Sequence, residues 1–263
     1  MGKTKAPRLL SEERRRKILE IVDETGRVTI SDVVKRLAVS AVTARGDLDS
    51  LSAAGTIVRS HGGAVRRLEP TRDYPVDFKA TLHRGEKQRI GEAAANLVKA
   101  NETIILDNGT TTAEVARHLK LMKPYNVTVI TNALNIATEL SDSPGISLIM
   151  IGGILRQISR SFVGPQAEQI LRELHADRLF LAVDGFDLEN GPSTPDILEA
   201  QLNGLMMDVA REVTIVADSS KLGRRSLSRI GAVERVNRLI TDTRAPEEFL
   251  SNLRARGLEV LTV

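Results

Sequence analysis

The residues best suited to binding a ligand form the hexapeptide DNGTTT at positions 107–112. Its glycine allows a tight turn, and the hydroxyl and backbone N–H groups of such a loop converge at the start of a helix, where anions bind. Polar residues, including a lysine, also follow other apolar segments of the chain. This set favours the binding of a phosphorylated small molecule. The predicted residues are Asp107, Asn108, Gly109, Thr110, Thr111, Thr112, Asn132, Gly152, Gly153, Asp184 and Lys221.

Helix capping is the alternative interpretation of each of these residues taken alone. A strand that ends in Asp or Thr before a helix often uses that side chain only as an N-cap. Five such ends in succession, with a glycine–threonine loop and a lysine, favour a phosphorylated ligand over capping alone.

Short apolar segments, alternating with amphipathic ones, must position these residues. The amphipathic segments begin at about 87, 111 and 133, and the first of them extends to 99. Apolar strands separated by helices are typical of a parallel sheet covered on both faces, which predicts an open, doubly wound α/β fold. Ligands of such sheets bind at the carboxyl ends of the strands, where the polar residues lie. The predicted strands are 103–107, 127–131, 146–151, 178–184, 213–218, 238–242 and 258–263.

Residues 28–65 predict a helix-turn-helix followed by a small glycine-turned ribbon. The first helix has a capping box, with Thr29 as the N-cap and Asp32 three residues later. The second helix follows Ser40, another N-cap residue, and ends before Gly55. A shorter helix, a tight connection and a longer helix in this order are typical of a DNA-binding module.

The longer helix has one apolar and one polar face. Ala44, Leu48 and Leu51 recur at i, i+4 and i+7 and form the core face. The opposite face is small and polar with one arginine, as a helix that enters a DNA major groove requires. The residues predicted to contact DNA, including those of the ribbon, are Thr29, Ser40, Val42, Thr43, Arg45, Asp49, Arg59, His61 and Arg66.

The charge distribution agrees with this assignment. Residues 1–70 contain 14 Lys and Arg against 9 Asp and Glu, a net charge of +5, whereas the other 193 residues contain 23 against 25, a net charge of −2. A basic excess at the DNA-binding end is what phosphate neutralisation requires, although a solvated basic tail would give the same excess. The run Arg14, Arg15, Arg16 and Lys17 fits a contact to the DNA backbone and a solvated helix face equally well.

The composition and the positions of proline and glycine residues predict the domain organisation. We expect a basic flexible tail at 1–10, a winged helix-turn-helix domain at 11–68 with its motif at about 28–47, a linker at 69–84 and a ligand-sensing domain at 85–263. The chain has no cysteine and its four histidines lie far apart, so we expect no metal site and no cofactor. No apolar run reaches the length of a membrane span, and the expected location is the cytoplasm.

The stretches VSAVTARGDLDSL and RSHGGA resemble the DeoR family of bacterial transcriptional regulators. The resemblance implies a winged helix-turn-helix before a sugar-phosphate-sensing domain that is similar in fold to sugar-phosphate isomerases. It also implies that DNGTTT cradles the phosphate and that DSSK, which ends at Lys221, supplies a lysine. The chain departs from the family pattern at Ala44 and Gly46. Because a glycine within a helix costs about 1 kcal/mol, the recognition helix is expected to be loose or to order fully on DNA.

Two further segments, 152–171 and 184–203, look most like the regulators of N-acetylgalactosamine and galactosamine catabolism. Glu199 falls where the family has an acidic residue near the sugar. Arg156 and Arg160 could add charge to the phosphate site or could be surface arginines. The stretch TPDIL before Glu199 departs from the acidic sequence of other members, which leaves the identity of the sugar open.

Two functions follow as alternatives. The first is a repressor that a phosphorylated sugar, such as an amino-sugar phosphate, releases from double-stranded operator DNA. The second is an aldose–ketose isomerase with an appended DNA-binding domain, which would need a general base and a ring-opening acid beside the sugar. Asp107, Asp184 and Glu199 could supply the base, but no histidine follows a predicted strand, so the repressor is favoured. A helix-turn-helix reads one half-site, and a homodimer or larger homo-oligomer is therefore expected.

Overall fold

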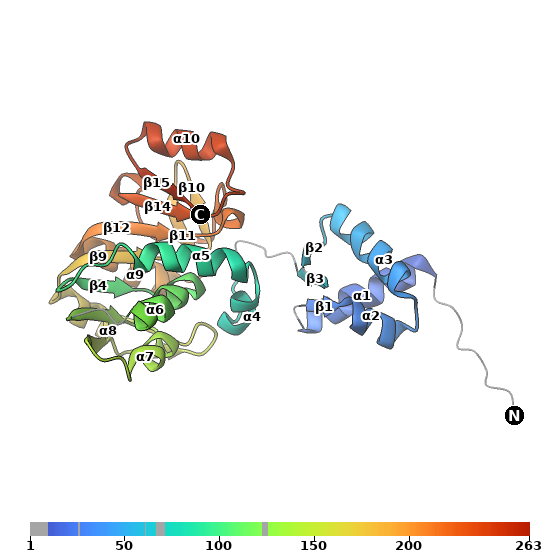
Figure 1. Ribbon diagram of the computed structural model, residues 1–263, viewed down its shortest axis with the longest axis horizontal. Helices are drawn as coiled ribbons and strands as arrows, with labels where there is room; N and C mark the ends of the chain where they lie inside the picture. Colours follow the sequence, from blue (N-terminus) through green and yellow to red (C-terminus); the bar gives the residue numbers. More distant parts are fainter. Residues whose placement is uncertain (1–9, 26, 61, 67–71, 123–125) are drawn as a thin grey trace, which may run out of the picture. The chain divides into compact units, whose positions relative to one another are not determined.

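The chain divides into two structural units, Met1–Glu69 and Pro70–Val263. The computed structural model describes residues 10–25, 27–60, 62–66, 72–122 and 126–263 (Figure 1). The expected basic tail, except for Leu10, and His61 lie outside these residues. No helix in the described ranges has the length and apolarity that crossing a membrane would require.

The first unit is a winged helix-turn-helix in which short polar caps start the helices. The Thr29–Asp32 capping box is present, and the Ser40 hydroxyl accepts a hydrogen bond from the Thr43 N–H group at 3.1 Å. The recognition helix continues through Gly46 without a break. The elements are α1 (Ser11–Thr25), β1 (Arg27–Thr29), α2 (Ile30–Leu37), α3 (Ala41–Ala53), β2 (Ile57–Ser60) and β3 (Gly63–Arg66).

The wing is a three-stranded antiparallel sheet in the order β1-β3-β2, of which the sequence predicted only the β2–β3 ribbon. A Cβ atom at Gly63 would lie 2.1 Å from the carbonyl oxygen of Val28, so β1 can pair with β3 only because residue 63 is glycine. The predicted core face of α3 is buried. It packs against Ile18 of α1, Val33 of α2 and Ile57 of β2.

A buried ion pair joins α1 to α3. The Asp47 carboxylate lies on α3 and accepts a hydrogen bond from Arg14 Nη2 at 2.9 Å, while Arg15 Nε lies 3.6 Å away. Arg16 pairs with Glu20 on its own helix at 3.8 Å. Arg14 therefore stabilises the helix packing, which is neither of the two roles, DNA contact or solvated face, that the sequence suggested for it.

The second unit is a doubly wound α/β domain, as predicted. Its seven strands form one parallel sheet in the order β15-β14-β12-β9-β4-β5-β6. The bounds of β5 match the prediction, and those of the other six strands differ from it by at most three residues. They are β4 (Thr103–Leu106), β5 (Val127–Thr131), β6 (Ile146–Met150), β9 (Ala176–Leu181), β12 (Ala210–Val216), β14 (Arg238–Thr241) and β15 (Glu259–Thr262).

Helices cover both faces of this sheet, and alternate side chains of each strand enter the two cores. Ile104 and Leu106 of β4 pack with α5, α6 and α7, whereas Ile105 packs with α8, α9 and α10. Figure 1 shows α5 and α6 together on one face. The helices are α5 (Arg84–Ala95), α6 (Thr110–Met122), α7 (Leu134–Leu140), α8 (Pro165–Arg172), α9 (Ile197–Val209) and α10 (Glu247–Ala255).

The expectation of a linker over 69–84 is wrong for most of that segment. The helix α4 (Val76–Thr81) lies within it and belongs to the second unit, where the Val76 N–H group donates to the Ile158 carbonyl at 2.8 Å. Tyr74 and Val76 are buried. The two prolines suggested a linker, but Pro75 is the N-cap residue of α4. The helix expected at 87–99 correspondingly starts at Arg84 and ends at Ala95.

Short elements between the main strands were not predicted. The strands β7 (Ile154–Arg156) and β8 (Ser161–Val163) form a hairpin. A second small sheet has the order β10-β11-β13, from Gly185–Asp187, Gly191–Thr194 and Ser228–Arg229. Two short 3-10 helices, η1 (Ser219–Lys221) and η2 (Val233–Arg235), flank β13. These additions all lie beyond the carboxyl ends of β6, β9 and β12 in the sequence and cover that edge of the sheet.

Candidate ligand site and DNA interface

Three neighbouring strands bring most of the predicted ligand residues to one edge of the sheet. Because β12, β9 and β4 are adjacent, the segment ending at Lys221, the residue Asp184 and the loop 107–112 follow strands that lie side by side. This is the edge at which ligands of open α/β sheets bind.

The loop after β4 is held in shape by its own polar groups. The Asp107 carboxylate accepts hydrogen bonds from the Gly109 N–H group at 3.1 Å and the Thr112 hydroxyl at 2.8 Å. Asp107 is only 2% exposed, and this burial raises its pKa to about 7. A Cβ atom at Gly109 would lie 2.1 Å from Ala182 Cβ, so the close approach of the loop to β9 requires glycine. Asp107 and Thr112 therefore support the loop, while Asn108 and Thr110 remain partly accessible.

Two lysines meet on one partly buried carboxylate. Asp184 Oδ2 lies 3.0 Å from Lys79 Nζ, and Asp184 Oδ1 lies 3.4 Å from Lys221 Nζ. Burial alone would raise the pKa of Asp184, but the two ammonium groups outweigh burial and lower it to about 2. Lys221 and Lys79 thus share the Asp184 carboxylate as their ion-pair partner.

A third lysine lies beneath this pair. Lys87 is 5% exposed, and its ammonium group donates to the Lys79 carbonyl oxygen at 2.6 Å. Its burial lowers its pKa to about 8. The Asp218 carboxylate is buried nearby and accepts from the Ser220 N–H group at 3.1 Å. Burial opposes the ionisation of Asp218, but Lys221, His83 and Lys87 together lower its pKa. We call Lys79, Lys87 and Lys221 the lysine cluster.

Arg156 pairs with three carboxylates, one of which, Asp73, also lies 3.6 Å from Lys79 Nζ. Its Nη1 lies 2.8 Å from Glu199 Oε1, its Nε lies 3.3 Å from Asp196 Oδ2, and its Nη2 pairs with Asp73. Its Nη1 also donates to the Ser159 hydroxyl at 2.9 Å. The side chain is 16% exposed. We call Arg156 with Asp73, Asp196 and Glu199 the Arg156 cluster.

Glu199 connects this cluster to the loop after β4. Its Oε1 accepts from Asn108 Nδ2 at 2.6 Å, and its Oε2 accepts from the Thr194 hydroxyl at 3.3 Å. Glu199 is only 4% exposed, and its position in the first turn of α9 follows from the N-cap Asp196. The acidic residue that the resemblance assigned to the sugar therefore lies within hydrogen-bonding distance of the predicted phosphate loop.

Three further predicted ligand residues, Asn132, Gly152 and Gly153, contact or lead into the hairpin that carries Arg156. Asn132 Nδ2 donates to the Phe162 carbonyl in β8 at 2.9 Å. Gly152 and Gly153 lead from β6 into β7, and Gly153 has a φ of 151°. Arg160, at the turn of the hairpin, is 50% exposed and pairs with Asp77. The sequence left the roles of Arg156 and Arg160 open. In the structure, Arg156 lies within the site and Arg160 lies at the protein surface.

Sequence reasoning missed four charged residues of the site: Asp73, Lys79, Lys87 and Asp196. The first two lie in the segment interpreted as a linker. For Lys87 a signal was present, because Ile90 and Ala94 follow it at i+3 and i+7 and are buried. A lysine that lies on the apolar stripe of a helix is expected to be buried, whereas one on the polar face is expected to be solvated.

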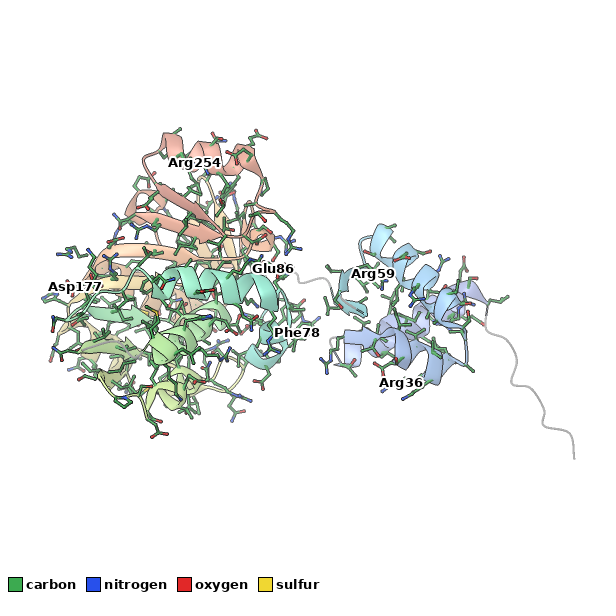
Figure 2. All side chains as sticks on the ribbon, viewed as in Figure 1. Arg36, Arg59, Phe78, Glu86, Asp177 and Arg254 are labelled. Carbon is green, nitrogen blue, oxygen red and sulfur yellow. The ribbon has the colours of Figure 1, made fainter. Side chains whose placement is uncertain are left out.

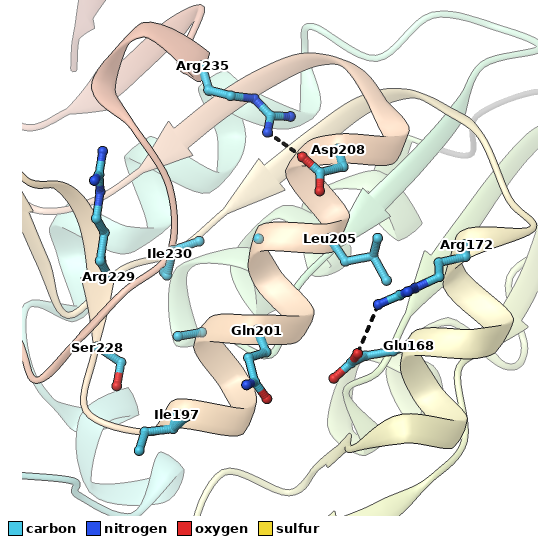
Figure 3. A pocket seen from close by; sticks show the side chains of 12 residues that line it. Glu168, Arg172, Ile197, Gln201, Leu205, Asp208, Ser228, Arg229, Ile230 and Arg235 are labelled. Carbon is cyan, nitrogen blue, oxygen red and sulfur yellow. Dashed lines mark hydrogen bonds and ion pairs between the residues drawn. The ribbon is translucent and has the colours of Figure 1, made fainter.

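A separate open groove lies along α9, outside the predicted ligand site (Figure 3). Its volume is about 760 Å³, and Ile197, Gln201 and Leu205 line it from one helix face. Two of its arginines already have acidic partners, since Arg172 lies 3.1 Å from Glu168 and Arg235 pairs with Asp208. In the described part of the chain, no group of three or more His, Asp or Glu side chains could hold a metal ion.

In the first unit, the predicted DNA-contacting residues divide into two groups. The hydroxyls of Thr29 and Ser40 cap α2 and α3. Arg59, labelled in Figure 2, pairs with Asp49 at 2.9 Å and donates to the Gly63 carbonyl at 2.7 Å, so both side chains fix the wing to α3.

The other group faces outward from α3. Val42 is 76% exposed, Thr43 is partly exposed, and Arg45 is exposed without a hydrogen bond or ion pair among the described residues. The side chain of Arg66 and all of His61 lie outside the described part of the chain. Arg45 is thus available for a base edge, whereas Arg59 is engaged within the unit.

Comparisons with known proteins agree with both units. Residues 14–68 match the DeoR-like helix-turn-helix domain, and residues 82–243 match the DeoR C terminal sensor domain. The chain is 40% identical over 255 residues to the "Putative aga operon transcriptional repressor" of Escherichia coli O157:H7, covering 96% of this chain and 94% of that protein. It is 36% identical to the "Uncharacterized HTH-type transcriptional regulator YulB" of Bacillus subtilis (strain 168), covering 97% and 98%.

A third relative is the "Transcriptional repressor AccR" of Agrobacterium fabrum, which is 36% identical and covers 89% of this chain and 90% of its own. These matches extend across both the helix-turn-helix and the sensor domain. The chain belongs to the DeoR family of transcriptional regulators.

Proposed function

We propose that this regulator represses a carbohydrate catabolism operon and that a phosphorylated sugar, specifically an amino-sugar phosphate, releases it from operator DNA. The observation that carries the proposal is the convergence of the lysine cluster at the carboxyl ends of β12 and β9, next to the loop that opens α6. Ammonium groups and helix N-terminal N–H groups bind phosphate oxygens through charge-assisted hydrogen bonds.

The charges of the site support an amino sugar. The lysine cluster has two carboxylates of its own, those of Asp184 and Asp218, and shares a third with Arg156, because Asp73 Oδ1 lies 3.6 Å from Lys79 Nζ. Besides the shared Asp73, the Arg156 cluster has two carboxylates, Asp196 and Glu199, for one guanidinium, an excess of one negative charge. A ligand with a phosphate at one end and an ammonium group at the other complements this arrangement. The name of the aga operon relative supports the same sugar class.

The isomerase alternative is weaker. A general base must be within hydrogen-bonding reach of the substrate proton that it removes. Asp107, whose pKa of about 7 would suit a base, is 2% exposed and is enclosed by Gly109 and Thr112. The three relatives described above are named as regulators.

We also propose that the functional form is a homodimer or a larger homo-oligomer. One helix-turn-helix contacts one half-site, and two-fold symmetric operators are read by symmetric dimers. The single winged helix-turn-helix of this chain supports that form.

The direct test of the proposed function is release from DNA. The full chain is bound to the fragment upstream of the genes beside its own and is titrated in a gel-shift assay with galactosamine 6-phosphate, N-acetylgalactosamine 6-phosphate and galactosamine. At least one phosphorylated sugar should release the DNA, and galactosamine should not, because the lysine cluster has no phosphate to bind. Equal responses to phosphorylated and free sugar would refute the phosphate requirement, and release by an unrelated sugar phosphate alone would refute the amino-sugar class.

Replacing Lys221 separates sensing from DNA binding. Lys221→Ala should bind the operator with unchanged affinity but need about 10- to 100-fold more effector for release, because a charge-assisted hydrogen bond contributes roughly 1.5–3 kcal/mol. The matched control is Lys99→Ala, an exposed lysine just before the amino end of β4, at the opposite edge of the sheet. If Lys221→Ala releases DNA at the wild-type effector concentration, the residue does not bind the effector.

Replacing Arg45 tests the DNA interface. Arg45→Ala should cost about 1–3 kcal/mol of operator binding and should reduce the discrimination between operator and random DNA, since arginine to guanine is the commonest specific base contact. Arg36→Ala on the exposed surface of α2 is the control, and any loss there should be alike for both DNAs. Competition binding with both DNAs measures the ratio. Unchanged discrimination by Arg45→Ala would remove Arg45 from sequence recognition.

A further inference from the structure

Lys87 is a buried cation without an anionic partner. Its side chain extends from the first turn of α5, and among the described residues its ammonium group has one hydrogen-bond acceptor, the Lys79 carbonyl oxygen at 2.6 Å, and no ion pair. An ammonium group has three N–H donors, so two of them have no acceptor in the described structure. Burying a charge in this way is unfavourable unless a further partner binds.

The surroundings of Lys87 indicate an anion as that partner. Lys221, Lys79, Asp218 and Asp184 are the charged groups that act on it. Asp184 already contacts both other lysines, and Asp218 accepts from Ser220. Asp73, which lies 3.6 Å from Lys79, is shared with Arg156, so the three ammonium groups have only Asp184 and Asp218 to themselves, and a phosphate group would supply further negative charge.

The topology brings the phosphate-binding loop to the same place. The helix α5 packs on α6 and against β12 and β14. Lys87 thus approaches from the α5 side, Lys221 from the loop after β12 and Lys79 from α4, while the amino end of α6 follows the neighbouring strand β4. Donors from four separate segments thus lie at the same edge of the sheet.

We propose that Lys87 binds the phosphate group of the effector directly and is the third cation of its subsite, together with Lys221 and Lys79. This assignment rests on the proposed function, because it takes the ligand to be phosphorylated. Under this assignment, the charge of Lys87 destabilises the ligand-free protein and stabilises the complex with the effector. A neutral residue of similar size should accordingly weaken phosphate binding without weakening the fold.

Proton uptake provides a specific signature. Burial lowers the pKa of Lys87 to about 8, so at pH 8.5 the amine is mostly neutral. A phosphate monoester is a dianion at this pH, and its approach favours the charged ammonium form. Binding should therefore take up about half a proton or more per phosphate bound. N-acetylgalactosamine 6-phosphate is a suitable probe because its nitrogen is an amide that does not titrate.

The experiment compares full-length wild type with Lys87→Met and Lys87→Gln. Isothermal titration with N-acetylgalactosamine 6-phosphate and with inorganic phosphate is run at pH 8.5 in buffers of different ionisation enthalpy, and melting temperatures are measured without ligand. Both variants should lose at least tenfold in affinity and lose the proton uptake. The melting temperature of Lys87→Met should be unchanged or higher, because its side chain replaces an unpaired buried charge.

Lys87→Gln is the control for a purely structural role, because its amide can still donate to the Lys79 carbonyl without a charge. Wild-type affinity and proton uptake in Lys87→Gln, or a lower melting temperature with unchanged affinity in Lys87→Met, would overturn the proposal. If a phosphorylated sugar releases the wild type from DNA, and both variants bind the probes with wild-type affinity and proton uptake, only the assignment of Lys87 fails. If wild type binds neither these two probes nor galactosamine 6-phosphate, the phosphate site and the proposed function fail together.

Discussion

Charge pairing at the carboxyl ends of the central strands is the constraint on which the second unit depends. Asp184 lies between the Lys79 and Lys221 ammonium groups, at 3.0 and 3.4 Å, and this pairing holds two cations together at a partly buried position. Without the carboxylate, like charges would repel one another and the site would not form before a ligand arrives. The doubly wound sheet makes the arrangement compatible with the chain, since β12, β9 and β4 are neighbours although they are distant in sequence.

The same pairing links the ligand site to the segment that connects the two units. Lys79 lies in α4, which begins at Val76, and Asp73 lies just before that helix. The boundary between the two units follows Glu69, only a few residues earlier in the chain. Under the proposed function, a phosphate that binds Lys79 and Lys221 competes with Asp184 for the same cations. Ligand occupancy therefore acts on the segment that leads directly to the DNA-binding unit, which is what a differential contact between two states requires.

The sequence predicted what short-range patterns determine. The seven apolar strands, the Thr29 capping box and the buried face of α3 were confirmed, because each depends on neighbours within a few residues. The segment around α4 was misinterpreted, since Pro75 looks the same in a linker and before a helix. The Arg14–Asp47 and Arg156–Asp73 pairs join residues far apart in sequence, and only tertiary structure decides them. Three-residue strands such as β7 and β8 are too short to have a periodic pattern.

The most direct test of the account is the reciprocity of the two binding events. If galactosamine 6-phosphate releases the chain by weakening its affinity for operator DNA, the operator must weaken effector binding by the same factor. Isothermal titration of the effector into free and operator-bound chain, with operator affinity measured with and without saturating effector, gives both factors. Under the proposed function the two factors are equal, at roughly 5- to 150-fold. An effector affinity that operator DNA leaves unchanged would contradict it.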